Sequence, residues 1–441
     1  MSEGLEFRIE WLDAPSVSTP ELANTWARYE IWVAGSCVTQ VEAADGTFRR
    51  SVYGSLYPLA EWVASNWWVL NNHIRPSAVD SHHWTWPNVR AYPWLSDHNV
   101  RGAGDGMPWP DLTIVGEGAV TRLVWAQDSS RSLGPIRFAS TGTALIRSSE
   151  VAEGLTALVD HVLERLAENG FRKTRLSEEW SALADTSQDE LEFCQTVAQM
   201  GMDPYSLSDE MADRVLRISS TLPQELMKDF FDSVDAGSLT EAAEWIDRAT
   251  IAAERASRKA EQDISVLRKA AAYARDDDSL PALERPWRIG YAMARRVREE
   301  LQIDVSDRFD TSPWVGISEV KAASGGLQGV ATVANDRCGL VLGGSYAGTQ
   351  AKRFKRAQTI GRAISQPNSP SFLISSARSK DERVARAFAA ELLAPADGIR
   401  QFLGNPTGDL DTAFERAAKR FDVSPLLVRH QYDNQLARAF G

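Results

Sequence analysis

The spacing of apolar residues changes from a strand period to a helix period near residue 147, and this change constrains the fold more than any other feature of the chain. Before it, FRIEWLD, RYEIWVAGSCVTQVEA and LTIVGEGAVTRLVWAQ alternate apolar with polar residues and are rich in β-branched and aromatic types, as half-buried strands are. After it, one helical stripe of apolar residues continues until Gly170 ends it. That stripe consists of Val151, Leu155, Leu158, Val159, Val162 and Leu166. The sequence therefore predicts an α+β multidomain protein.

Tryptophan and lysine mark the same boundary. Of the 15 tryptophans, 11 precede residue 126, and the first lysine is Lys173. We therefore expect a β-rich domain over 1–147, with one helix inside it at YGSLYPLAEWVASNWWVLNN. Helical periods then continue over 148–278, and DDDSLPALERP has the composition of a linker. A third domain over 279–441 completes the predicted division.

Length and charge exclude several classes of protein. A chain of 441 residues suits two to four domains on the usual scale of roughly 100–200 residues each. Its net charge of −12 gives no overall attraction to nucleic acid or to anionic membranes. No apolar run is long enough to span a bilayer, and MSEGLEFRIEW lacks the layout of a signal peptide. We expect a cytoplasmic protein without membrane partners.

Cysteine usage agrees with a cytoplasmic location. Cys37, Cys194 and Cys338 are widely separated, odd in number and without C-x-x-C spacing. We expect them to be small buried apolar residues rather than disulfide partners or nucleophiles.

The segment from Arg353 to Pro395 carries the most specific motif. It reads RFKRAQTIGRAIS and, after a polar gap, ERVARAFAAELLAP. This segment resembles the ImmA/IrrE family of metallopeptidases, in which an arginine-phenylalanine pair opens a helix carrying HExxH and a later E-x-x-A-x-x-F-A-x-x-L-L-x-P segment supplies the third zinc ligand. The resemblance extends from Pro286 to the C-terminus and implies a zincin-like α+β C-terminal domain. The alternative is an alanine-rich amphipathic helical domain that mimics the pattern by chance.

Three of the positions that bind zinc or activate water in that family carry other residues here. Gln358 and Arg362 stand where the resemblance places the two histidines, Thr359 where it places the glutamate, and Glu382 where it places the third ligand. An amide is a poor zinc ligand, a threonine hydroxyl is no base near neutral pH, and a guanidinium repels a metal ion. We therefore expect no metal, no cofactor and no catalytic residue. Instead, Arg362 should form an ion pair with Glu382, and Gln358 should donate a hydrogen bond to the same carboxylate.

Two surfaces are candidates for binding a protein partner. The loop from Asn71 to Asp111 carries Trp84, Trp86, Trp94 and Trp109, which supply rigid contact area if exposed. The alternative is an excursion packed over the β core, and the histidines of this loop have no familiar metal-ligand spacing. The second candidate is a basic rim at the start of the motif helix, formed by Lys352, Arg353, Lys355 and Arg356. Its alternative is a solvated helix start.

The resemblance implies a regulatory setting for this protein but does not imply a particular chemical reaction. Family members with intact sites are linked to cleavage of repressor proteins in stress responses, mobile-element control and toxin–antitoxin settings. We expect a non-catalytic ImmA/IrrE-like protein that acts as a protein-binding sensor or regulator, with phage defence as a further setting. One alternative is a metallopeptidase with rearranged ligands that cleaves a repressor-like protein. The other is a DNA-binding regulator with a helix-turn-helix around Gly201 to Pro204, which the acidic start of its second helix disfavours.

Overall fold

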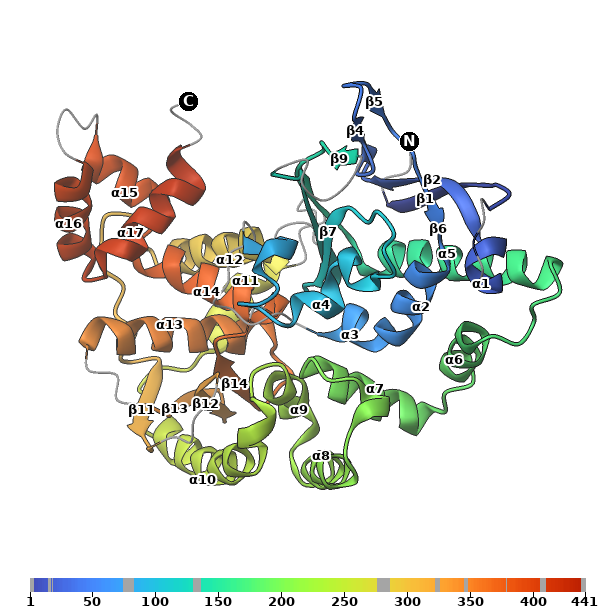
Figure 1. The fold of residues 1–441 in the computed structure, drawn as a ribbon. Coiled ribbons are helices and arrows are strands. Elements are labelled where there is room, and N and C mark those ends of the chain that lie inside the picture. Colours follow the sequence, from blue (N-terminus) through green and yellow to red (C-terminus); the bar gives the residue numbers. More distant parts are fainter. Residues whose placement is uncertain are drawn as a thin grey trace. The chain divides into compact units, whose positions relative to one another are not determined.

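The computed structural model describes residues 4–14, 17, 19–73, 83–129, 136–275, 286–321, 326–344, 348–377, 379–404 and 410–437. It is a mixed α+β structure in which a β-rich N-terminal region is followed mainly by helices, as predicted (Figure 1). The chain forms two compact units, Met1–Ala212 and Asp213–Gly441. In its described parts, no helix is long and apolar enough to cross a membrane.

The strands of the first unit pair in antiparallel fashion. One sheet contains β1 (Leu5–Trp11), β2 (Trp26–Val33), β3 (Ser36–Cys37) and β6 (Val52–Ser55). A second contains β7 (Asp111–Gly116), β8 (Val120–Ala126) and β10 (Gly142–Arg147). A third contains β4 (Val41–Ala43), β5 (Phe48–Arg49) and β9 (Ile136–Phe138). The alternation in the sequence thus corresponds to strands in all three sheets.

Helices cover these sheets and extend the first unit beyond the predicted boundary. They are α1 (Pro20–Asn24), α2 (Tyr57–Ser65), α3 (Trp67–Asn72), α4 (Leu95–His98), α5 (Ser148–Glu168), α6 (Arg175–Ala184) and α7 (Gln188–Gln199), with short 3-10 turns at η2 (Trp86–Asn88), η3 (Val100–Ala103) and η4 (Pro204–Ser206). Every residue of the predicted stripe on α5 is buried, and α5 packs against β1 and α2. Since that stripe completes the core of the β-rich region, α5 belongs to the same unit as the strands.

The second unit is built on a mixed four-stranded sheet. Its order is β11 (Val315–Glu319), β13 (Arg337–Leu342), β12 (Leu327–Ala334) and β14 (Ser371–Ser375). The β11–β13 pair is parallel and the other pairs are antiparallel. Asn335 and Asp336 link β12 to β13 with positive φ angles of 49° and 58°, the conformation that a two-residue hairpin turn needs.

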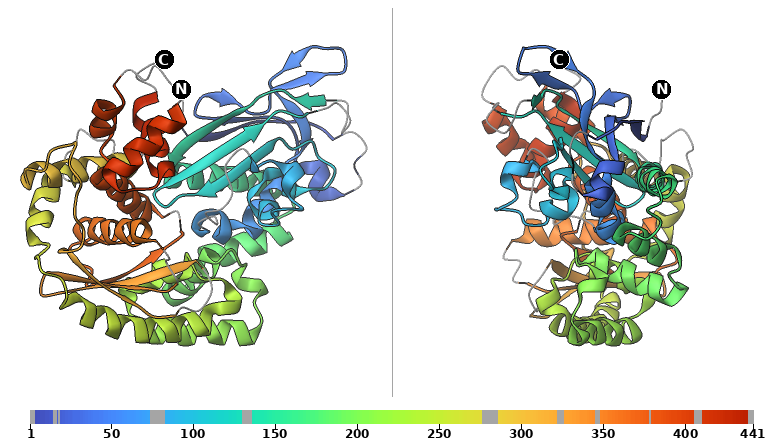
Figure 2. Two further views of the ribbon diagram at one scale, coloured as in Figure 1. Left: turned by 90° about the vertical axis from the view of Figure 1, so that its left-hand side faces the viewer. Right: turned by 45° about the vertical axis from the view of Figure 1, so that its right-hand side comes forward.

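The second unit also contains helices. They are α8 (Asp209–Thr221), which crosses the unit boundary, α9 (Gln224–Phe231), α10 (Leu239–Ser257), α11 (Ser265–Arg275), α12 (Pro286–Glu300), α13 (Thr349–Ser365), α14 (Lys380–Leu393), α15 (Ala396–Leu403), α16 (Leu410–Phe421) and α17 (Pro425–Gln431), with a 3-10 turn at η5 (Ala236–Ser238) and a π-helical turn at η6 (Tyr432–Leu436). Of these, α9, α10 and α13 contact the sheet. Figures 1 and 2 show α10 on one face of the sheet and α13 on the other.

Helix α10 lies unusually close to the sheet, at two glycines. A Cβ atom at Gly316 would lie 1.8 Å from the carbonyl oxygen of Ala256, and one at Gly339 would lie 2.0 Å from that of Ala253. Only glycine allows backbone to approach backbone at this distance. The close contact makes α10 an integral layer of the second unit.

The two observed units differ from the three predicted domains. The predicted helical region 148–278 is divided, because α5 buries its stripe on the first unit and α10 packs on the sheet of the second. Helical periodicity alone does not show which sheet a helix covers, so the sequence did not reveal the division. The predicted linker lies almost wholly in residues 276–285, which fall outside the described residues.

Candidate functional site

The motif residues lie in the interior of the second unit, between α13 and α14. Gln358, Thr359 and Arg362 follow one another on α13 and have exposed fractions of 0%, 0% and 2%. Glu382, in the first turn of α14, is also fully buried. The two helices pack closely, and a Cβ atom at Gly361 would come within 2.9 Å of the Phe388 ring. Four polar side chains are therefore held in a dry helix interface, where each needs a partner.

Glu382 finds its partners in groups that donate hydrogen bonds. Nε2 of Gln358 donates to Oε2 of Glu382 at 2.5 Å, which confirms the predicted contact. The main-chain N–H of Ser375 donates to Oε1 at 2.7 Å, and the Ser375 hydroxyl lies 3.3 Å from the same oxygen. The guanidinium of Arg386 lies 3.7 Å from Oε2. Both carboxylate oxygens are thus engaged by the protein itself.

The predicted ion pair between Arg362 and Glu382 is wrong. Nη2 of Arg362 instead donates a short hydrogen bond to Oδ2 of Asp229 on α9, and Nη1 lies 3.5 Å from Oδ2 of Asp381. The physical reason is that Gln358 and Ser375 already engage Glu382, while α9 brings Asp229 to the buried guanidinium. The sequence did not indicate that Asp229 belongs to this site.

Burial changes the pKa of the Asp229 carboxyl group. Removal from water raises the pKa of Asp229 to about 6, and the positive charge of Arg362 opposes that rise. Nε and Nη1 of Arg362 make no hydrogen bond within the described parts of the chain. The guanidinium is therefore stabilised mainly by the charges of nearby carboxylates, because its set of hydrogen bonds is incomplete.

Thr359 and Lys355 complete the cluster. The Thr359 hydroxyl donates to the carbonyl of Lys355 at 2.8 Å, within its own helix. Nζ of Lys355 donates to Oε1 of Gln358 at 2.8 Å and also to the side-chain oxygen of Gln328. Burial lowers the pKa of Lys355 to about 8, although the charge of Glu382 acts in the opposite direction. A continuous hydrogen-bonded chain thus runs from Lys355 through Gln358 to Glu382.

The predicted basic rim is not a free surface. Arg353 is buried, with 5% exposed, and Lys355 points into the cluster. Arg353 donates to the main-chain carbonyls of Phe309, Phe421 and Asp422. Lys352 pairs with Glu319 at 2.6 Å, and Nε of Arg356 donates to the carbonyl of Val315 at 3.2 Å. The prediction of an exposed cation is therefore wrong for Arg353, which fastens the helix start to its own unit, whereas the side chain of Lys352 is 35% exposed.

The four loop tryptophans do not form one exposed surface. Trp84 and Trp109 are buried, with 1% and 3% exposed, whereas Trp86 and Trp94 are half-buried. Trp84 packs edge to face on Trp94, with ring centroids 6.0 Å apart. The prediction of an exposed recognition surface is therefore wrong for Trp84 and Trp109, because the aromatic rings complete the core of the first unit.

Two histidines of the same region form a buried pair. Nδ1 of His98 lies 2.7 Å from the carbonyl of Ile114 and must donate to it, so Nε2 of His98 accepts from Nδ1 of His73 at 2.9 Å. Burial lowers the pKa of His73 to about 3 and that of His98 to about 4. Both rings are consequently neutral hydrogen-bonding groups. Across the described ranges, no group of three or more metal-ligating side chains could hold a metal ion.

The cysteines agree only partly with the prediction. All three are free thiols, and Cys194 and Cys338 are buried. Cys37 is half-buried, with its sulfur 3.4 Å from the carbonyl of Arg50.

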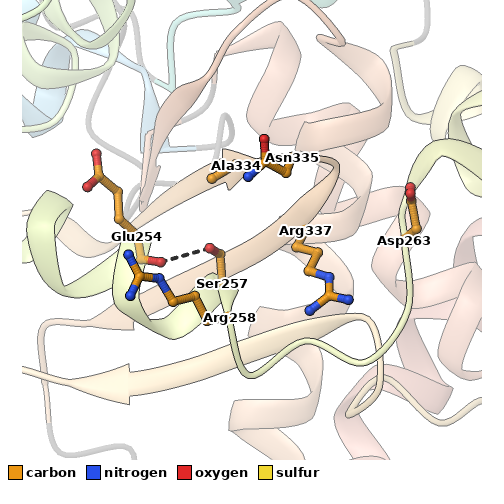
Figure 3. A pocket seen from close by; sticks show the side chains of 7 residues that line it. All are labelled: Glu254, Ser257, Arg258, Asp263, Ala334, Asn335 and Arg337. Atoms are coloured by element: carbon orange, nitrogen blue, oxygen red, sulfur yellow. Dashed lines mark hydrogen bonds between the residues drawn. The ribbon is translucent and has the colours of Figure 1, made fainter.

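A polar pocket of about 530 Å³ lies elsewhere in the second unit (Figure 3). The end of α10 and the β12–β13 turn line it, and the Ser257 hydroxyl donates to the Glu254 carbonyl at 2.8 Å. Glu254, Asp263, Arg258 and Arg337 balance one another in charge. This pocket shares no residue with the cluster around Glu382.

Comparison with known proteins adds nothing to this geometry. No protein-family model matches the chain, and a search of curated proteins gives no match.

The sequence does contain a pattern that indicates the burial of Asp229. In PQELMKDFFDSV, Asp229 lies beside Phe230 and three residues after Leu226, on the face of α9 that is buried. An acid within an apolar helical stripe indicates a buried carboxylate with an unidentified partner.

The buried ion pair gives a first prediction. Arg362→Met should lower the free energy of unfolding by about 3–5 kcal/mol, because Asp229 is left buried without a counterion. The double variant Arg362→Met/Asp229→Leu should recover most of that loss. Urea unfolding of the wild type, both single variants and the double variant measures the coupling. The exposed pair Arg400–Asp397, 3.0 Å apart, is the control and should couple by less than about 1 kcal/mol. Additive effects at Arg362 and Asp229 would contradict the prediction.

Lys355 gives a second prediction, concerning pH. Its pKa is about 8 in the folded protein and 10.5 in the unfolded chain, so the folded state binds fewer protons between these values. The contribution of Lys355 to stability is then fully present above pH 10.5 and is lost as the pH falls to 8. The free energy of unfolding of the wild type, minus that of Lys355→Met, should therefore rise from pH 8 to pH 10. Lys352→Met serves as the control. A flat difference for Lys355→Met across this range would contradict the assignment.

Proposed function

We propose that this chain is a non-catalytic ImmA/IrrE-like protein that binds a protein partner as a sensor or regulator. The observation that carries the proposal is the internal pairing of the cluster. Gln358 and Glu382 bond to each other, and Arg362 is paired with Asp229. A hydrolytic site needs an open metal position and a free base, and these side chains offer neither.

Zinc does not fit the residues at this site. Oε1 of Gln358, the only ligand atom of that side chain, already accepts from Lys355. The guanidinium of Arg362 is a buried permanent cation, which would repel a second positive charge nearby. The residues that the resemblance assigns to metal binding thus serve as hydrogen-bond and ion-pair partners, and we derive no reaction step from them.

Exposed apolar side chains support the binding part of the proposal. Phe402, Leu410 and Leu426 are 44%, 40% and 61% exposed. They lie on α15, α16 and α17, of which α16 contacts both of the others (Figure 1). Large apolar side chains exposed on neighbouring helices are typical of protein-binding surfaces. We assign the partner contact to these helices rather than to the motif helix.

The biological setting rests on the resemblance alone. It favours phage defence, mobile-element control or a toxin–antitoxin setting, and a cytoplasmic location agrees with three unpaired thiols. A metallopeptidase with rearranged ligands is the competing proposal, and Asp229, Asp381 and Glu382 would be its acids. It is weaker because Arg362 neutralises the first two. A DNA-binding regulator is weaker still, since α8 starts with Asp209 and Glu210.

The third prediction tests the loss of metal binding. Elemental analysis of the purified wild type should find far less than one zinc ion per chain. A quadruple variant should bind about one zinc ion per chain; it combines Gln358→His, Thr359→Glu, Arg362→His and Asp229→Asn. The first three changes supply the zinc ligands and the base, and the fourth removes the acid that would lose its partner Arg362. The Asp229→Asn variant alone is the control and should stay metal-free. Stoichiometric zinc in the wild type would favour the metallopeptidase instead.

The fourth prediction tests the binding surface. Cross-linking in the native cells, followed by mass spectrometry, should capture the same partner with the wild type and with Ile251→Glu, whose side chain is 54% exposed on α10. Phe402→Glu/Leu426→Glu should reduce capture at least about tenfold, because it places charge in the apolar contact. Undiminished capture by the double variant would exclude α15–α17 as the docking surface.

A further inference from the structure

The first unit contains a pocket of about 670 Å³ that is independent of the polar cluster. It lies between the β4–β5–β9 sheet, strand β6 and the loop that follows η3. Drug-sized and cofactor-sized molecules occupy pockets of roughly 300–1,000 Å³. The volume is therefore sufficient for one small molecule.

Aromatic side chains form much of the wall. Trp86, Trp109, Tyr53 and Phe138 all line the pocket, together with aliphatic residues of β4, β6 and β9. Trp109 is fixed, because its Nε1 donates to the Gly104 carbonyl at 3.0 Å and its ring packs 5.8 Å from that of Tyr29. The pocket is thus shaped before a ligand arrives, which lowers the entropic cost of binding. Flat aromatic walls favour a planar ring.

The charged groups of the floor are already paired. Arg101 donates to Oδ1 of Asp128 at 2.5 Å and to the carbonyl of Trp109 at 3.1 Å. Oδ2 of Asp128 accepts from the main-chain N–H of Phe138 at 3.0 Å. A ligand that reaches the floor therefore meets no charge that needs a counterion, so its buried part should be apolar and neutral.

The rim offers a positive charge. The side chain of Arg49 lines the pocket, is 55% exposed, and stands 4.0 Å from Asp45, at the limit of an ion pair. An exposed pair at this distance contributes little, so the guanidinium is available to an anion. Ser51 and Tyr53, which also line the pocket, carry hydroxyl groups.

We propose that this pocket binds a small planar aromatic molecule carrying one anionic group. The ring lies in the interior against Trp86 and Trp109, and the anion lies at the rim against Arg49. The molecule is a ligand and undergoes no reaction there, since the groups that line the floor are engaged with one another. The first unit would thereby sense a small molecule, a role separate from the partner-binding surface of the second unit.

Anilinonaphthalene sulfonate is a suitable probe, because it combines a planar aromatic body with one sulfonate. Its neutral analogue, anilinonaphthalene without the sulfonate, isolates the contribution of the charge. Fluorescence titration of the full chain should show saturable binding of both probes. Arg49→Gln should weaken the sulfonate probe about three- to tenfold and leave the neutral probe unchanged. Trp86→Ala should weaken both probes at least about tenfold.

Phe402→Ala is the matched control, since it removes an exposed aromatic ring of the second unit. It should leave both affinities unchanged. Equal weakening by Phe402→Ala and Trp86→Ala would mean that the probe binds apolar surface in general and would overturn the proposal. So would an Arg49→Gln variant that binds the sulfonate probe like the wild type. Because Arg49 is exposed, its replacement tests the proposal even if Trp86→Ala proves unstable.

Discussion

A buried guanidinium needs hydrogen-bond acceptors beside it, and the packing of the helices around the motif depends on the acceptors that Arg362 finds. Its partner Asp229 is supplied by α9, a helix 133 residues earlier in the chain, while Asp381 approaches from the start of α14. The charges of α9, α13 and α14 therefore compensate one another at this point. Because α9 also contacts β14, the edge of the sheet is fixed to the same pair. Removing α9 or α13 would leave the charge on the other helix buried without its partner.

Beside this ion pair, polar side chains hold neighbouring helices together. A catalytic carboxylate or amide needs an unoccupied lone pair or a proton that it can give up. In the cluster, Gln358 donates to Glu382 and accepts from Lys355, and the hydroxyl of Thr359 turns back to its own helix. The hydrogen bond from Gln358 to Glu382 holds α13 against α14. The proposal of a binding protein follows from this internal satisfaction.

The sequence predicted correctly those contacts in which both residues belong to one helical stripe or one motif. The α5 stripe and the contact between Gln358 and Glu382 are of this kind, since a helical period or a single motif places both ends. The sequence did not predict the pairing of Arg362 with Asp229, because nothing near Arg362 indicates that α9 will approach it. Burial of single residues was equally hard to infer. Arg353 belongs to a run of cations that suggests a solvated helix start, yet α13 directs it toward three carbonyls. Tryptophan composition alone did not distinguish the buried Trp109 from the half-buried Trp86.

The contact of α10 with the sheet limits how this protein can diverge. At Gly316 and Gly339 the space that any other residue would fill is already taken by the backbone of α10, so a mutation there has to displace a whole helix and not a single side chain. Neighbouring positions on the outer face of α10 carry no such restriction. We therefore expect the solvent side of this helix to tolerate substitution, whereas the two glycines facing it cannot be exchanged without moving the helix.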